Sequence, residues 1–208
     1  MNTIIQTITR RIRAKQRGWV FTPKDFLDVG SRAAVDQTLS RLVKQGFIRR
    51  LDRGVYDFPK THPTLGILSP SADDLAQAVA AQTGDIVFPS GAAAANFLGL
   101  STQVPARPVF MTNGSTRTKK VAGRNIRLQH ARVPIMQQIS DKANFVLQAL
   151  YYLGQNNIDD DVIIKCADRL DDKDFRKLAS ILSRIPGWMA DMILKMQDIK
   201  NGQIRAAA

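Results

Sequence analysis

The chain of 208 residues contains one cysteine, two histidines and no glutamate among its 18 acidic residues. A single thiol excludes an intrachain disulfide and a cysteine-rich metal cluster. Cys166 falls at an apolar position of a helical segment, where a buried and inert thiol is expected. His62 lies in a proline-rich stretch and His130 ends a basic strand, and neither has a carboxylate or nucleophile partner evident in the sequence.

Other marks of an enzyme are missing as well. The chain has no glycine-rich phosphate loop, and Ser90-Gly91 is not a nucleophile elbow because Phe88 replaces the leading glycine of that motif. Asp73-Asp74 and Asp159 to Asp161 offer oxygen ligands for Mg²⁺. Both runs open predicted helices, however, where carboxylates stabilise the positive end of the helix dipole. We therefore expect a protein that is not an enzyme and has no catalytic residue, no cofactor and no metal.

Long apolar runs are also absent. No stretch approaches the length of a membrane span, and the N-terminus lacks the charged tip, apolar core and small-residue cleavage site of a signal peptide. The hydrophobic content of 44% is enough for one large or two small domain cores. The sequence thus predicts a soluble globular protein of the cytoplasm that does not contact a membrane.

The chain does contain a helix-turn-helix pattern followed by a hairpin. Thr22 can cap a short helix that begins at Pro23, and Ser31 can cap a second helix that ends near Gln45, before Gly46. Two β-prone runs, 47–51 and 55–58, flank a turn at 52–54 and indicate a wing. An amphipathic helix over about 2–16 comes first, with isoleucines on its inner face. Residues 1–60 therefore form a predicted winged helix-turn-helix DNA-binding domain.

The second helix of this motif has two distinct faces. Val35, Leu39, Leu42 and Val43 recur at the spacing of one apolar stripe. The opposite face carries small, amide, hydroxyl or cationic side chains, the types that approach base edges and phosphates closely. Together with the wing arginines, these side chains give the candidate DNA-binding residues Arg32, Ala33, Gln37, Ser40, Arg41, Lys44, Arg49, Arg50 and Arg53.

Positive charge is concentrated in the same region. Residues 1–60 hold 13 Lys and Arg against 5 Asp, a net +8 of the chain's total of +12. A basic helical face is often only solvated, and winged helices also serve as protein-docking modules. The uneven charge favours a polyanionic partner, and with the helix-turn-helix pattern it indicates double-stranded DNA.

A Pro-rich linker over 61–70 is predicted to lead into a C-terminal domain over 71–208. In that domain we expect helices at 71–82, 90–98, 143–153, 160–170, 172–185 and 188–200, a strand at 85–88, and a small antiparallel meander between 108 and 129. The predicted fold class is α+β, with an N-terminal winged helix-turn-helix and a mixed C-terminal domain of one small antiparallel sheet and several helices.

A second basic surface is predicted on the meander. Residues 101–132 carry seven Lys and Arg and no acidic residue, and the candidate residues are Arg117, Lys119, Lys120, Arg124 and Arg127. Such cations either solvate the open face of the sheet or contact nucleic acid or an acidic protein. Residues 141–174 hold 8 Asp against 4 Lys and Arg, so patches of opposite sign permit domain contact or self-association.

Several segments resemble the AbiEi-type antitoxin and transcriptional-regulator family. They are Arg53-Gly54-Val55-Tyr56, Pro89-Ser90-Gly91-Ala92, the stretch from Ala95 to Ala106, Met111-Thr112-Asn113-Gly114 and the run from Gln148 to Gly154. The resemblance covers roughly residues 5–155, and Asn96 to Ala106 is its most specific part. Members of this family belong to bacterial type IV toxin-antitoxin operons.

The resemblance implies an N-terminal winged helix that represses its own operon at inverted repeats and a C-terminal domain required for antitoxin action. It also implies a nucleotidyltransferase toxin as the functional partner, without need of a stable complex. The leading hypothesis is thus a DNA-binding repressor of the antitoxin type. A winged-helix regulator unrelated to a toxin, with a dimerising or ligand-sensing C-terminal domain, is the alternative, and an accessory enzyme associated with RNA or a nuclease is a third.

Overall fold

The computed structural model describes residues 3–103 and 107–202. Asn2, where the first helix was expected to start, and Val104 to Ala106, which end the most specific part of the resemblance, lie outside the described residues.

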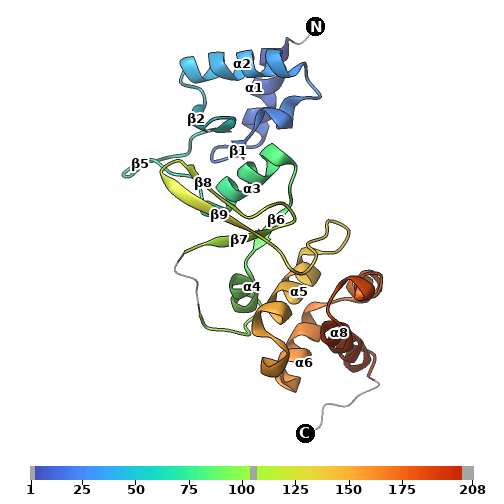
Figure 1. Cartoon of the computed structure of the whole chain (residues 1–208). Coiled ribbons are helices and arrows are strands. Elements are labelled where there is room, and N and C mark those ends of the chain that lie inside the picture. The colour runs from blue at the N-terminus through green and yellow to red at the C-terminus, as the bar shows by residue number, and fades with distance from the viewer. Residues whose placement is uncertain (1–2, 104–106, 203–208) are drawn as a thin grey trace. The chain divides into compact units, whose positions relative to one another are not determined.

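Helices and small sheets both occur, which confirms the α+β class (Figure 1). The chain divides into two compact units, Met1–Asp85 with Arg117–Arg127, and Ile86–Thr116 with Leu128–Ala208. No helix within the described ranges is both long and apolar enough to cross a bilayer.

The first unit begins with α1 (Ile4–Ala14), β1 (Val20–Phe21), the 3₁₀ helix η1 (Pro23–Phe26), α2 (Arg32–Lys44), β2 (Arg49–Asp52) and β3 (Val55–Asp57). Local chemistry sets the helix ends. The Thr3 hydroxyl and the Gln6 side chain form a capping box at the start of α1. Ser31 accepts a hydrogen bond from the Ala34 N–H at 3.4 Å, and Gly46 adopts φ +68° just after α2.

A three-stranded antiparallel sheet, in the order β1-β3-β2, supports these helices. The prediction did not include β1, which pairs Val20 with Asp57 and Phe21 with Tyr56. The core between helices and sheet is aliphatic and aromatic, with Ile8, Ile12, Phe21, Phe26, Val35 and Leu39 almost fully buried. Burial of such side chains contributes roughly 1.5–3 kcal/mol each, so this small core can hold α2 in a fixed orientation.

The first unit also includes segments that lie beyond residue 60. A short hairpin, β4 (Thr61–His62) with β5 (Gly66–Ile67), occupies the stretch predicted as an irregular linker. Helix α3 (Ala72–Thr83) follows, capped by Ser71 and stopped by Gly84 at φ +86°, and it packs against β1. Strand β8 (Arg117–Val121) and the start of β9 (Arg124–His130) belong to the same unit. The compact units therefore divide the chain differently from the predicted domains 1–60 and 71–208.

The second unit contains β6 (Val87–Pro89), α4 (Gly91–Phe97), β7 (Val109–Thr112), α5 (Asp141–Leu153), η2 (Gln155–Asn157), α6 (Asp160–Arg169), α7 (Asp172–Ala179), η3 (Leu182–Arg184) and α8 (Gly187–Lys200). The strands β6 to β9 follow the sheet order β6-β7-β9-β8. Ala122 and Gly123, both at positive φ, form the two-residue turn between β8 and β9. The helices enclose a core that includes Leu147, Leu150, Ile163, Phe175 and Met189.

Of two helices predicted in the second unit, one packs as expected and the other is interrupted. The alanine-rich α4 was expected to approach a neighbour closely, and it does so on α5: a Cβ added at Gly91 would lie 2.5 Å from Tyr152 Cβ. The single helix predicted over 172–185 is instead split into α7 and η3. The Ser180 hydroxyl donates to the Lys177 carbonyl at 2.6 Å, and such local hydrogen bonds compete with helix continuation.

Candidate nucleic-acid interface

Helix α2 presents its predicted polar face to solvent. Val35, Thr38, Leu39 and Leu42 are buried on the other side. The exposed face comprises Ala33, Gln37, Ser40, Arg41 and Lys44. Within the described part of the chain, no hydrogen bond or ion pair of these five side chains is found, so the amide and both cations can reach an external partner.

Arg32 is exposed as predicted but has an internal partner. Its Nε donates to Asp36 Oδ2 at 2.9 Å, one helical turn away, and the two side chains are 55% and 46% exposed. Exposed pairs of this spacing are worth only about 0.3–0.5 kcal/mol. A phosphate can therefore compete with Asp36 for the guanidinium.

The segment before α2 is fixed by a local hydrogen-bond set. The Asp25 carboxylate accepts from the Thr22 N–H at 2.8 Å and from the Thr22 hydroxyl at 3.0 Å. Pro23 starts η1, and the Phe26 ring packs edge-on against Phe21 at 5.5 Å between centroids. This arrangement leaves Lys24 exposed at the edge of the α2 face.

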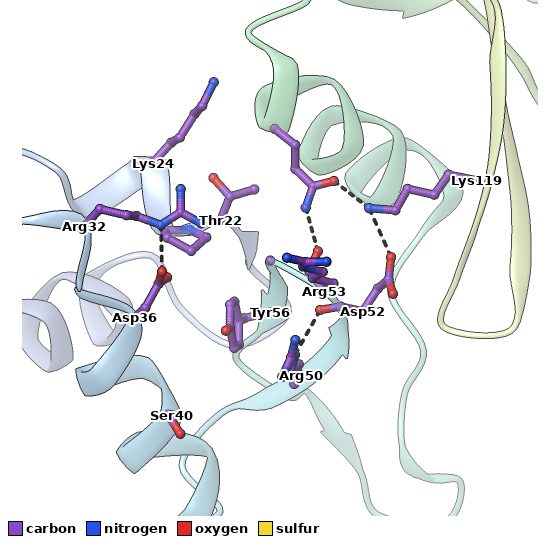
Figure 2. A pocket seen from close by; sticks show the side chains of 13 residues that line it. Thr22, Lys24, Arg32, Asp36, Ser40, Arg50, Asp52, Arg53, Tyr56 and Lys119 are labelled. Carbon is purple, nitrogen blue, oxygen red and sulfur yellow. Dashed lines mark hydrogen bonds and ion pairs between the residues drawn. The ribbon is translucent and has the colours of Figure 1, made fainter. Parts of the chain in front are cut away.

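A groove of about 700 Å³ lies between α2, η1 and the β2–β3 hairpin. Figure 2 shows its polar side chains, with Lys24, Arg32, Asp36 and Ser40 on one wall and the hairpin residues on the other. The lining includes five cations, Lys24, Arg32, Arg50, Arg53 and Lys119, against two carboxylates, Asp36 and Asp52. The excess of cations suits a polyanion.

The two neighbouring arginines of β2 have opposite orientations. Arg50 is exposed and lines the groove, as does Arg53 in the turn. Arg49 instead forms an ion pair with Asp57, which is only 1% exposed, and donates to the Leu68 carbonyl at 3.0 Å. The hydrogen bond to Asp57 raises the pKa of Arg49 above its usual value. Alternation along the strand thus turns Arg49, unlike Arg50, toward partners inside the protein, so its guanidinium is already engaged by Asp57 and Leu68.

The turn of the hairpin is attached to α3 and β8. Gln82 Nε2 donates to the Arg53 carbonyl at 2.8 Å, and its Oε1 accepts from Lys119 Nζ at 2.6 Å. Lys119 also pairs with Asp52 at 3.0 Å. Burial by itself would raise the pKa of Asp52, but the Arg53 N–H, the Lys119 hydrogen bond and nearby positive charge outweigh it and lower that pKa. Asp52 thus remains a carboxylate at neutral pH.

The second predicted basic surface is divided by its pairing. Arg117 and Lys119 lie on one side of β8 with carboxylate partners, Asp85 at 2.7 Å and Asp52 at 3.0 Å. Arg124 is exposed and donates to the Pro70 carbonyl at 3.3 Å, whereas Lys120 and Arg127 are exposed with no partner among the described residues. The β8–β9 hairpin therefore does not present a single surface on which all five cations are available.

The remaining candidate groups have local roles. Burial raises the pKa of the Cys166 thiol to about 12, as expected for an inert core cysteine. Asp159 caps α6 by accepting from the Val162 N–H at 2.9 Å, and Asp74 pairs with the Ser71 hydroxyl at the start of α3. The described residues contain no group of three or more metal-binding side chains. His130 Nδ1 contacts the Gly114 carbonyl at 2.8 Å.

The amino-acid sequence matches the model of a protein family. The chain belongs to the family described as "Family of unknown function (DUF6088)", whose model matches residues 7–178. The comparison with curated proteins gives no match. The matched range runs from α1 into α7, so it includes η1, α2, the β2–β3 hairpin, α3 and β8, which line the groove.

Proposed function

We propose that the chain is a DNA-binding transcriptional repressor that uses α2 and the β2–β3 wing to recognise its own promoter. The observation that carries this proposal is the exposed face of α2, where Gln37 and Arg41 are one turn apart and have no internal partner in the described structure. Glutamine and arginine make bidentate contacts with adenine and guanine edges in the major groove. Neither side chain is explained by the packing of the first unit.

The element order supports a winged helix-turn-helix. Helices η1 and α2 are joined by a short turn, and the hairpin β2–β3 follows with its turn beside the groove. With α2 in the major groove, Lys24, Arg32 and Lys44 would contact phosphates on one side, and Arg50 and Arg53 would do so on the other. Phosphate contacts set affinity and register, whereas Gln37 and Arg41 would read sequence.

The antitoxin role is a further part of the proposal, and it is supported by the resemblance to AbiEi-type regulators. On this reading the chain acts in the cytoplasm of a bacterium, represses a type IV toxin-antitoxin operon at inverted repeats, and neutralises a nucleotidyltransferase toxin through its C-terminal part. A regulator without a toxin, with the second unit as a dimerisation or ligand-sensing module, is the alternative. A toxin gene downstream, and rescue of growth when both genes are expressed, would favour the antitoxin.

The DNA-binding proposal is tested with the double variant Gln37→Ala/Arg41→Ala. Loss of each base contact should weaken specific binding by about 1–3 kcal/mol while the fold is kept, because both side chains are exposed. Gel-shift affinity for the chain's own promoter is the measurement, and random duplex DNA is the control ligand. Unchanged discrimination between the two duplexes would show that α2 does not read the operator.

A further inference from the structure

The turn of the wing is held by residues outside the helix-turn-helix and its hairpin. Gln82, at the end of α3, bridges the Arg53 carbonyl and Lys119. Lys119 pairs in turn with Asp52 (Figure 2). Gly54 makes the bridge possible, since a Cβ at this position would lie 2.9 Å from Gln82 Nε2. All of these residues belong to the first compact unit.

We propose that Gln82 and Lys119 are positioning residues for DNA binding. They hold the wing turn so that Arg50 and Arg53 face the groove, which Lys24 and Arg32 line on its other wall. The inference rests on the proposed function, since it assigns a role to the wing arginines in contacting phosphates. Lys119 itself acts through Asp52, because the two charges neutralise each other at the turn.

The physical reason is the cost of ordering a hairpin tip. Strand β1 pairs only with Tyr56 and Asp57 of β3, so the tip of the hairpin is two-stranded. A two-stranded hairpin has little stability of its own in water, and β2 and β3 are only four and three residues long. A flexible tip would have to become ordered at the moment of binding, which reduces affinity. Two polar contacts reach the tip, from Gln82 to the Arg53 carbonyl and from Lys119 to Asp52, and a third joins Gln82 to Lys119. They fix the tip beforehand, so the arginines are already placed when DNA arrives.

Two variants separate this role from a simple charge effect. Gln82→Ala removes the bridge without changing charge, and we expect affinity for any duplex to fall about tenfold, which corresponds to about 1.4 kcal/mol. The slope of log affinity against log salt should fall by about 0.9 for each phosphate that the wing no longer reaches. Asp52→Asn removes a negative charge from the groove, so a simple charge effect predicts tighter DNA binding. The positioning role predicts weaker binding instead, because the variant loses the Asp52–Lys119 pair.

Matched controls come from positions remote from the bridge in sequence. Asp73→Asn removes one exposed carboxylate in the first turn of α3, and Gln138→Ala removes one exposed amide of the second unit. Neither control should weaken DNA binding. Tighter binding by Asp52→Asn, or equal salt slopes for Gln82→Ala and the wild type, would overturn the positioning role.

Hydrogen exchange of the free protein gives a readout independent of DNA. Amides of residues 52–55 should exchange faster in Gln82→Ala than in the wild type, with the rest of the first unit unchanged. Unchanged exchange at the turn would refute the bridge even if DNA binding is normal. Failure of the wild-type chain to bind any duplex would instead refute the proposed function, and with it the role of the bridge, even if exchange rises as expected.

Discussion

Replacement of Arg49 by alanine should destabilise the first unit rather than only weaken DNA binding. The substitution removes two hydrogen bonds to the Asp57 carboxylate and one to the Leu68 carbonyl. Asp57 is 1% exposed, so its charge would lose its cationic partner without gaining much water. Arg49 pairs with Asp57 across β2 and β3, and its third hydrogen bond attaches the chain just after β5.

The expected size of the effect follows from burial. Removal of one partner of a buried ion pair costs about 3–5 kcal/mol, and we take the lower end, about 3 kcal/mol, because the Arg49 side chain is 32% exposed and water can reach part of the site. For a cooperative unit of about 100 residues this corresponds to a drop in Tm of roughly 12–24 °C. The double replacement Arg49→Met/Asp57→Leu should recover most of the stability, since apolar pairs often replace buried ion pairs without cost.

Arg50 provides the matched control, because it is adjacent in sequence and exposed to the groove. Arg50→Ala should change stability by no more than about 0.5 kcal/mol, yet lower the salt slope of DNA binding by about one. Thermal melting and salt-dependent gel shifts measure both properties for each variant. A normal Tm for Arg49→Ala together with a reduced salt slope would refute the structural role and restore Arg49 as a phosphate-binding residue.

Two further predictions concern packing and pH. Gly91→Ala should lower the stability of the second unit by about 1–3 kcal/mol in thermal melts, because the added Cβ would overlap Tyr152; Gly187→Ala, also at the first position of a helix but with nothing within 4 Å, should not, and equal effects would refute the packing argument. The pKa of Asp85 is lowered, first by the Thr83 hydroxyl and then by Arg117; a lowered folded-state pKa stabilises above the unfolded value of about 3.9, and this stabilisation disappears as pH falls through the folded value. Asp85→Asn should therefore melt below the wild type at pH 7 and converge with it at strongly acidic pH, whereas a constant difference would contradict this assignment.

The starts of several helices and the end of α2 are predictable from the sequence because capping is local chemistry. Ser31, Ser71 and Ser90 each accept a hydrogen bond from the N–H three residues on, and Gly46 follows α2 in the left-handed conformation. A serine before an apolar periodic run contains all the information needed for that prediction. The burial of Val35, Leu39 and Leu42 on α2 is likewise predictable, because the spacing of apolar residues along the helix is enough to indicate the buried face.

Features that depend on distant partners were not predictable in this way. The two-residue strand β1 is too short for a periodic pattern and exists because β3 offers a free edge. Arg49 and Arg50 are identical side chains in the sequence, and only the pairing of β2 with β3 decides which one meets Asp57. A shift of one residue in that register would exchange their roles.

The distribution of charge illustrates the same limit and bears directly on function. A net charge summed over a segment counts cations without showing where their counter-ions lie, and Lys119 finds its carboxylate in Asp52, far away in sequence. Part of the positive charge of the β8–β9 hairpin is therefore paired inside the protein. Lys119 attaches this hairpin to the wing and helps to fix the position of the wing turn. The cations of α2 and the wing that lack a carboxylate partner in the described structure, Arg41, Lys44, Arg50 and Arg53, are the ones whose charge is available to a polyanion. Because these four lie on the two elements that carry the proposed DNA contacts, pairing supports that interface more strongly than total charge does.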